Sequence, residues 1–281
     1  STLSSSSAAS DVYKRQDLHL VGKEIFRFHS IIWPALLMAL DIPLPNKVFG
    51  HGWLVVDGAK ISKSFGNYKD PRVYINETSV DSLRYFLLHE VVLGQDGNFS
   101  EELFLEKSNS DLSNDLGNLV SRVTAMVVKY NGGTLRLGSG EEEYDEVLKN
   151  LATSLKSEVE NKMDSLKINE ALTKIWELIR YANKYIDLSM PWILAKEGKK
   201  KRLDRVLYNL CETIRIVGVL LQPYFVETPE KIFTQLGILG DSSLTSWEGL
   251  NEFGMLKEGT KITKGENLFP RIETVSYTHL T

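Results

Sequence analysis

Apolar residues recur every three or four positions through most of the chain after residue 100, the spacing that places them on one face of an α-helix. The first such stripe runs from Leu103 to Val127 and stops at Asn131-Gly132-Gly133, a typical helix end. Three more stripes follow, over residues 144–163, 169–188 and 202–221. Because each has one apolar face, they predict an all-α antiparallel helical bundle.

The chain before residue 100 has a different pattern, in which helix-like and strand-like segments alternate. Helical spacing runs from Glu24 to Leu40, with a kink or a break expected at Pro34 because proline cannot donate a backbone hydrogen bond. The segment from Val48 to Val56 is rich in bulky and β-branched residues and predicts a strand. A helix leading into a strand is one crossover of a parallel sheet, so we expect an α/β fold here.

Short signals divide the chain further. Thr78-Ser79-Val80-Asp81 has capping-box spacing and predicts a helix start. Asp96-Gly97-Asn98 marks the end of the α/β part, and the Gly- and Ser-rich segment from Leu236 onward is expected to pack back on the bundle. The expected ranges are therefore 17–98 for the α/β part, 99–235 for the bundle and 236–273 for the tail. Residues 1–16 and 274–281 have no periodicity or break away from the pattern, and we interpret both as non-native sequence.

Composition changes this picture in three respects. The single cysteine, Cys211, excludes an internal disulfide and leaves no cysteine pair for zinc, as expected in a reducing cytoplasm. No apolar run is long enough to cross a membrane, so no membrane role is expected. The net charge of -4 argues against bulk electrostatic binding of nucleic acid. Any RNA contact must be local, and the one concentrated basic run, Lys196 to Arg202, directly follows Trp192.

The most specific chemical signal is Lys60-Ile61-Ser62-Lys63-Ser64, which lies between Gly58 and Gly66. Two ammonium groups and two hydroxyls leave from the end of the expected strand, as in loops that bind phosphate. Lysine suits this role because it is a compact charge that can follow moving phosphate oxygens. Taken alone the pattern also fits an ordinary solvated turn.

The sequence of this loop resembles the KMSKS signature of class I aminoacyl-tRNA synthetases, with Ile61 in place of methionine. Other segments are similar to one family of that class, the methionyl-tRNA synthetases, and the likeness covers about Asp17 to Glu273. These segments are Gly22 to His29, Trp33-Pro34-Ala35, Asp81 to Tyr85, Asn118 to Arg122, Pro191-Trp192 and Gly265 to Ile272. The resemblance implies the C-terminal part of a Rossmann-like catalytic domain followed by an anticodon-binding bundle.

The resemblance also implies roles in activating L-methionine with ATP and Mg²⁺. Lys63 would stabilise the leaving pyrophosphate with help from Lys60, because cations that bind more tightly at the transition state lower the barrier. Ser62 and Ser64 would shape the loop or donate hydrogen bonds to ATP.

Three further residues of the α/β part would bind the substrates. Gly22 would admit the adenine and Glu24 would bind the ribose of ATP. His29 would line the methionine pocket. Without the resemblance, Glu24 is an exposed carboxylate in a first helical turn, and His29 is a core histidine.

In the bundle, the resemblance assigns the CAU anticodon of tRNA(Met) to Asn118, Arg122 and Trp192. Asn118 and Arg122 are four residues apart and share a helix face, where they could bind base edges. Trp192 would stack on an anticodon base. Otherwise the first two would be solvated surface and Trp192 a core residue.

Two family features are absent from the sequence: the HIGH motif and the zinc-bearing insertion, both expected upstream. We therefore expect no zinc site in this portion and no activity from this segment by itself. The alternative from another class is a non-catalytic tRNA-binding helical module, which would not need the KISKS loop. A synthetase for leucine, valine or cysteine would share the loop but not the segments at Gly22 and Pro191, and a helical scaffold without a ligand would leave every motif unexplained.

Overall fold

The computed structural model describes residues 17–61 and 70–273. By its internal contacts the chain divides into two compact units, one formed by residues 1–68 and 91–99 and the other by residues 69–90 and 100–281. Residues 70–90, expected from the sequence in the α/β part, thus pack with the helices. Each unit is described by itself below, and the three domain ranges expected from the sequence stay a prediction.

The first unit contains a parallel β–helix–β crossover. Strand β1 (Leu18–Gly22) pairs in parallel with β2 (Lys47–His51), and Leu20 lies opposite Phe49. The connecting helix has a π-helical segment, η1 (Phe28–Ile32), followed by α2 (Trp33–Ala39). The N–H of Trp33 donates to the carbonyl of Phe28, five residues back, just before Pro34. The irregularity expected at the proline is therefore a widened turn in a continuous helix.

A second small sheet follows, with strand order β4, β3, β5. Strand β3 (Leu54–Val56) is antiparallel to β4 (Ala59–Lys60) and parallel to β5 (Gly97–Phe99). The single strand expected from Val48 to Val56 was wrong, because the chain leaves β2 at Gly52. A Cβ atom on Gly52 would lie only 2.1 Å from the carbonyl oxygen of Gln95. The backbones of Gly52 and Gln95 therefore approach too closely for any residue with a side chain at position 52.

In the second unit, α3 (Pro71–Glu77) precedes α4 (Val80–Glu90). The helix start expected at Thr78 to Asp81 is confirmed, because α4 begins at Val80, but the capping box itself does not form. Instead, the hydroxyl of Ser79 accepts the Ser82 N–H, and the hydroxyl of Thr78 donates back to Tyr74 in the preceding helix. The Asp81 carboxylate accepts the N–H groups of residues 226, 227 and 228, so it caps another helix, α11 (Thr228–Gln235).

A long rod of three helical segments follows. It consists of α5 (Glu101–Lys107), the π-helical η3 (Ser108–Gly117) and α6 (Asn118–Asn131). The apolar stripe predicted from the sequence is buried from Leu112 to Val127. The rod ends at Gly132 and Gly133, whose positive φ values of 61° and 74° glycine adopts without strain.

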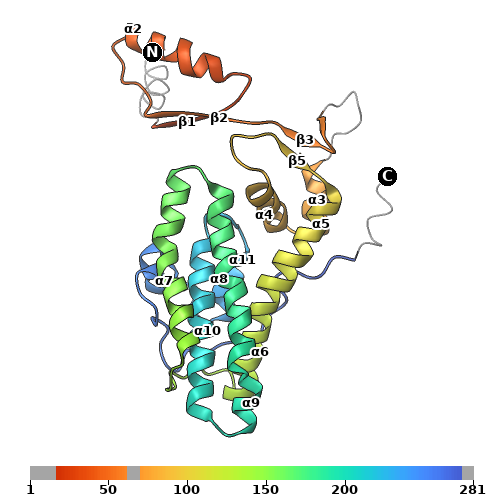
Figure 1. Ribbon diagram of the computed structural model, residues 1–281, viewed down its shortest axis with the longest axis vertical. Helices are drawn as coiled ribbons and strands as arrows, with labels where there is room; N and C mark the ends of the chain where they lie inside the picture. The colour runs from red at the N-terminus through yellow and green to blue at the C-terminus, as the bar shows by residue number, and fades with distance from the viewer. Residues whose placement is uncertain (1–16, 62–69, 274–281) are drawn as a thin grey trace, which may run out of the picture. The chain divides into compact units, whose positions relative to one another are not determined.

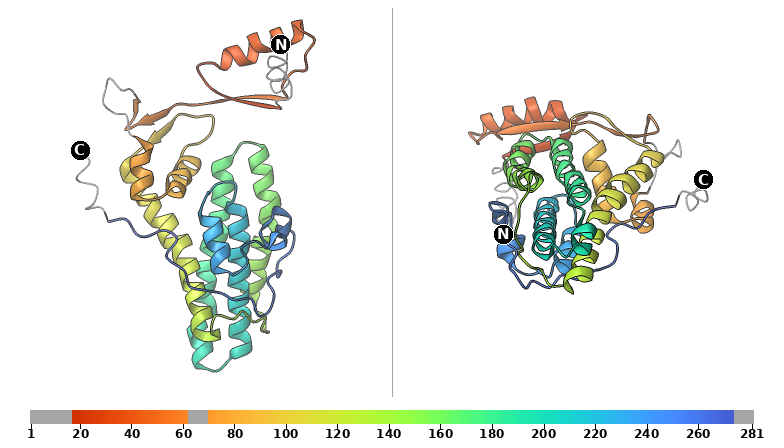
Figure 2. Two further views of the ribbon diagram at one scale, coloured as in Figure 1. Left: turned by 180° about the vertical axis from the view of Figure 1, so that it is seen from behind. Right: turned by 60° about the horizontal axis from the view of Figure 1, so that its bottom comes forward.

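The other helices of the bundle are α7 (Glu143–Asp164), α8 (Ile168–Ser189) and α10 (Lys200–Leu221). Helices α8 and α10 lie beside α6, and α7 packs on α8 and α10 (Figure 1). The predicted ranges differ from these by at most two residues at any end. Figure 2 shows the same helices from behind and from below, with α10 packed among the others. Every residue of α10 from Val206 to Leu221 is buried. The antiparallel bundle predicted from the sequence is confirmed.

Shorter elements complete this unit. The helix α9 (Pro191–Lys196) links α8 to α10, and α12 (Ser242–Thr245) and the 3₁₀ turn η4 (Trp247–Leu250) follow α11. The segment after Leu236 packs back on the bundle, as expected, with Leu256, Ile262 and Phe269 buried. It is tied to α10 through Arg215 and Glu212, which are fully buried. Arg215 donates to the carbonyls of residues 244, 249 and 252, and Glu212 accepts the N–H groups of residues 254 to 256.

Candidate functional sites

The KISKS loop begins at a tight hairpin. Asp57 and Gly58, with φ values of 49° and 76°, form the two-residue turn between β3 and β4. Both left-handed residues suit a type I′ turn, for which Asp-Gly is a preferred sequence. The turn sets Lys60 opposite Val55. Of the expected phosphate-binding residues, Lys60 is described, whereas Ser62, Lys63 and Ser64 lie outside the described residues.

Lys60 belongs to a charged cluster built around Trp53. The Nζ atoms of Lys60 and Lys23 lie 4.1 and 4.3 Å from the centroid of the indole ring. The carboxylate of Asp96 accepts hydrogen bonds from Lys23 Nζ at 2.5 Å and from the backbone N–H of Trp53 at 2.8 Å. The Lys23 ammonium and the Trp53 N–H hold the pKa of Asp96 below its usual range. This cluster joins the ends of three segments of the first unit.

The proposed adenosine-binding residues lie together at the end of β1. The Oε2 atom of Glu24 is 2.9 Å from the position that a Cβ atom on Gly22 would occupy, and Glu24 is exposed. The chain turns here, because the Lys23 N–H donates to the His51 carbonyl at the end of β2. The carboxylate is thus available at the carboxyl end of a parallel strand, where α/β sheets commonly bind ligands.

His29 lines a hollow of about 580 Å³ in the first unit. Its Nδ1 atom lies 3.0 Å from the Ile25 carbonyl of the preceding turn. The other lining residues are mostly apolar: Leu18, His19, Leu20, Val21, Phe28, Ile32, Trp33 and Leu36. His29 is half-buried at this hollow and is not a core histidine. An apolar wall with two imidazoles, those of His19 and His29, suits a small, largely apolar ligand.

In the bundle, Asn118 and Arg122 lie on α6 with their side chains exposed and half-buried, respectively. The guanidinium of Arg122 donates to Asp187 of α8 at 3.3 Å, and 68% of the Asp187 side chain is exposed. Such an exposed ion pair is worth little energy in water. Arg122 is thus held in place by a contact that a ligand could exchange at small cost.

Trp192 is 45% exposed, so it is not a core residue. Helix α8 ends at Ser189, and the positive φ of 43° at the next residue, Met190, turns the chain into α9. Pro191 is buried at the first turn of α9, and Trp192 follows it.

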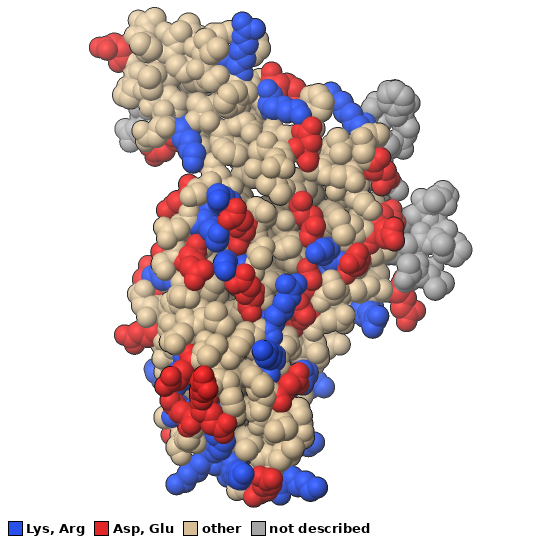
Figure 3. All heavy atoms as spheres, in the orientation of Figure 1, with Lys and Arg blue, Asp and Glu red and all other residues tan. Residues whose placement is uncertain are grey.

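The exposed lysines of the basic run, Lys196, Lys199 and Lys201, are close to Trp192 in sequence. Lys and Arg side chains gather at this end of the bundle in Figure 3. An exposed aromatic ring beside local positive charge is suited to a nucleic-acid base.

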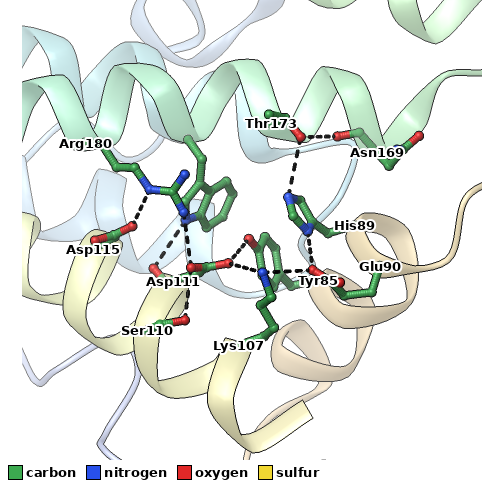
Figure 4. Close-up of polar contacts among 11 residues, drawn as sticks. Tyr85, His89, Glu90, Lys107, Ser110, Asp111, Asp115, Asn169, Thr173 and Arg180 are labelled. Atoms are coloured by element: carbon green, nitrogen blue, oxygen red, sulfur yellow. Dashed lines mark hydrogen bonds and ion pairs between the residues drawn. The ribbon is translucent and has the colours of Figure 1, made fainter. Parts of the chain in front are cut away.

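A polar network ties α4 to the bundle (Figure 4). At its centre is Asp111 of η3, whose carboxylate accepts hydrogen bonds from Tyr85 at 2.7 Å and from Arg180 at 3.2 Å. Arg180 also binds Asp115 at 2.9 Å. Burial raises the pKa of Asp115, although Arg180 opposes that shift, and burial together with Asp111 raises the pKa of Tyr85. Each charged group has a partner, so the network orients α4 on the helices.

No group of three or more His, Cys, Asp or Glu side chains is arranged to hold a metal ion among residues 17–61 and 70–273. Over the same ranges, no helix is both long and apolar enough to span a bilayer.

Comparison with known proteins identifies the family of the chain. Residues 10–124 match the family described as tRNA synthetases class I (M), and residues 136–279 match the anticodon binding domain of methionyl tRNA ligase. The α/β crossover, the KISKS segment and the attached bundle are therefore those of a class I tRNA synthetase. More particularly, the chain belongs to the methionyl-tRNA synthetase family.

Individual relatives agree with this assignment. The chain is 56% identical to the methionine–tRNA ligase of Caldanaerobacter subterraneus subsp. tengcongensis over 93% of its own length, and 55% identical to that of Clostridium acetobutylicum over 92%. It spans only 41% and 39% of those proteins. The structure of Mycobacterium tuberculosis methionyl-tRNA synthetase in complex with methionyl-adenylate superposes with a TM-score of 0.88 at 37% identity, covering 96% of this chain and 53% of that one.

Two contacts at these sites were missed from the sequence. The Lys60–Trp53 contact had a signal, because Asp57-Gly58 between two strand-like segments indicates a hairpin that pairs Val55 with Lys60. The Arg122–Asp187 pair joins two helices 65 residues apart in sequence, and no local pattern indicates it.

Proposed function

We propose that this chain supplies the KMSKS-type loop and the anticodon-binding bundle of an enzyme that activates methionine. That enzyme forms methionyl-adenylate from L-methionine and ATP and transfers the methionyl group to tRNA(Met). The observation that carries the proposal is the hairpin at Asp57-Gly58, which starts the KISKS loop with Lys60 at the edge of a sheet in a chain of this family. The α/β crossover would belong to a Rossmann-like catalytic domain.

The chemistry assigned to the loop is charge stabilisation. When the carboxylate of methionine attacks the α-phosphate, negative charge builds up on the departing pyrophosphate. Lys63, assisted by Lys60, would bind those oxygens more tightly in the transition state than in the ground state, which raises the rate. Ser62 and Ser64 would donate hydrogen bonds within the loop or to ATP, and Mg²⁺ would accompany the ATP.

The substrate-binding roles rest on the surroundings of each residue. Exposed Glu24 at the end of β1 would accept the ribose hydroxyls, and Gly22 beside it would admit the adenine. His29 would contact methionine in the apolar hollow, whose walls suit a thioether side chain.

The anticodon roles rest on exposure. Trp192 presents a ring for a base to stack on, and Asn118 and Arg122 present hydrogen-bonding groups on one face of α6. These three residues would also serve the other candidate, a tRNA-binding module without catalysis. That candidate gives no role to the KISKS loop.

A chimera would test the proposal. Residues 17–273 would replace the matching segment of the Caldanaerobacter ligase, and methionine-dependent exchange of pyrophosphate into ATP would be measured. Exchange that is lost in Lys63→Ala supports the enzyme. The other result would be a chimera that binds tRNA(Met) and still exchanges pyrophosphate at the unsubstituted rate when it carries Lys63→Ala and Lys60→Ala. That result would favour the binding module.

A further inference from the structure

We infer that Trp53 is a positioning residue for the KISKS loop, and that its indole ring holds the ammonium group of Lys60 where the loop begins. The inference deepens the proposed function and rests on it, since it concerns how a lysine of the loop is presented to phosphate. Nothing in the loop sequence itself indicates this role, because Trp53 precedes Lys60 by seven residues and lies just before β3, the other strand of the hairpin.

The sheet places the two side chains on one face. Lys60 lies opposite Val55 in the antiparallel pair, so their side chains share a face. Trp53 is two residues before Val55, and side chains two apart along an extended chain also point to the same face. The large indole ring of Trp53 can therefore reach Lys60, its diagonal neighbour on the other strand. The distance of 4.1 Å between Lys60 Nζ and the ring centroid is within the range of a cation–π interaction.

The backbone of Trp53 is held on both sides. The Trp53 N–H donates to Asp96 at 2.8 Å, and the Trp53 carbonyl accepts the Gly97 N–H at 2.8 Å. Gly52 lies so close to the backbone of Gln95 that no side chain fits there. The backbone that carries the indole ring is therefore fixed, and the ring has fewer rotatable bonds than a lysine side chain.

The charges around the ring are arranged to favour Lys60. A second ammonium, that of Lys23, lies 4.3 Å from the same ring centroid and would repel Lys60. Asp96 forms an ion pair with Lys23 at 2.5 Å, which offsets that charge. Lys23, Lys60 and Asp96 together carry one net positive charge, and the contact with the ring holds the Lys60 ammonium in place before ATP binds. Holding a catalytic group in position before the substrate binds is a recognised way in which enzymes accelerate a reaction.

Nuclear magnetic resonance on the chain as given tests the contact. The Lys60 side-chain methylene protons should be shifted upfield by the ring current, relative to those of exposed Lys47 in β2. The shift should disappear in Trp53→Leu and persist in Trp53→Phe, which keeps a ring face but lacks the indole N–H. Lys60 resonances at the same position as those of Lys47 in the unsubstituted chain would overturn the inference, even if Trp53→Leu failed to fold.

Pyrophosphate exchange in the chimera tests the role. Trp53→Leu should lower kcat about two- to five-fold at saturating ATP, the size expected for one exposed cation–π contact, and Trp53→Phe should stay near the unsubstituted rate. If Trp53 acts through Lys60, then Trp53→Leu should cause no further loss in a Lys60→Ala background. A purely structural role predicts the same loss in both backgrounds, and that result would overturn the inference.

The two proposals fail differently in this experiment. If the exchange rate drops in Lys60→Ala but not in Trp53→Leu, only the positioning role of Trp53 is contradicted. If the exchange rate drops in neither Lys60→Ala nor Lys63→Ala, the proposed function of the loop is contradicted, and so is the positioning role. Thermal unfolding of Trp53→Leu and Trp53→Phe, measured on the same samples, shows whether a loss of rate reflects a loss of fold.

Discussion

Asp81 and Thr228 are joined by two hydrogen bonds although 147 residues separate them in sequence. The Asp81 Oδ2 atom accepts both the backbone N–H and the hydroxyl of Thr228, each at 2.7 Å. The other carboxylate oxygen accepts the Val226 N–H at 2.7 Å. The side chain thus caps the start of α11 from α4, and it is 1% exposed. One carboxylate therefore fixes two helices that no local sequence signal connects.

Replacing Asp81 with alanine should lower the free energy of unfolding by about 3–5 kcal/mol, because buried backbone donors lose a charged acceptor. Thermal or urea unfolding of the full chain would measure the loss. Asp241→Ala is a suitable control, since Asp241 caps the short helix α12 by the same kind of bond, but this residue is only half-buried and the bond itself is exposed. An Asp81 variant no less stable than this control would contradict the capping role.

Lys63→Ala in the chimera should depress the rate of methionyl-adenylate formation by roughly 10²–10³-fold, since it removes one charge contact to the transition state. Methionine affinity should change little, because methionine does not need this lysine in the ground state. Pyrophosphate exchange at varied methionine concentrations separates the two parameters. An unchanged exchange rate would remove Lys63 from the mechanism.

The chain as given should show no methionine-dependent pyrophosphate exchange. Its sequence contains no HIGH motif, and it spans 41% of the length of its Caldanaerobacter relative. A site that lacks one half of its ATP contacts cannot hold the reacting groups in line. The chimera serves as the positive control, and turnover by the purified chain would show that this view of the catalytic site is wrong.

Trp192→Ala should weaken tRNA(Met) binding by about 1–3 kcal/mol, the usual worth of one stack between an aromatic ring and a base. Because the ring is exposed, the melting temperature should be nearly unchanged. Binding to transcripts with CAU and altered anticodons, measured on the same sample, gives the test. A melted bundle, or an equal loss for every RNA, would show that Trp192 serves the fold.

Asn118→Ala and Arg122→Ala should reduce discrimination between CAU and other anticodons more than they reduce general RNA affinity. Groups that contact base edges carry sequence information, whereas contacts to phosphate do not. Comparing the ratio of the two dissociation constants in each variant measures this directly. A uniform loss of affinity would instead indicate phosphate binding.

The free energy of unfolding should fall as the pH rises from about 10 to 12, and Tyr208 should account for part of the fall. Burial and Glu212 raise the pKa of Tyr208 to about 12 in the folded chain, whereas an unfolded tyrosine loses its proton near pH 10. The folded state then binds more protons in this window, so stability is lost with rising pH. Urea unfolding from pH 8 to 12 should show a shallower decline in Tyr208→Phe. An identical slope would exclude Tyr208 as the source.

The long helices could be predicted from the sequence because their apolar periodicity is determined by burial on one face. The segments 144–163, 169–188 and 202–221 lie within α7, α8 and α10 for that reason. Prediction failed where a residue with a local sequence signal binds a distant part of the chain instead. Asp81 has capping-box spacing, but its carboxylate caps α11. The strand expected through Gly52 failed likewise, because the close approach of Gln95 depends on a segment more than 40 residues away.

The candidate sites were predictable only in part. The motifs named Lys60, His29, Asn118, Arg122 and Trp192, and their functional roles stay predictions. Sequence spacing could not show that Trp192 is exposed, since exposure depends on how α8 ends at Met190. Nor could it show which acidic group faces Arg122, because Asp187 belongs to a different helix.

The bonds between the α10 pair Arg215–Glu212 and the C-terminal tail have a consequence for cooperativity. Detaching the tail would leave a guanidinium and a carboxylate buried without their six backbone partners, a state nearly as costly as opening the bundle itself. Partial fraying of the tail is therefore suppressed around residues 244–256. The backbone amides of Gly254, Met255 and Leu256 would then exchange with deuterium at the rate set by global unfolding, so the bundle and the tail form one foldon.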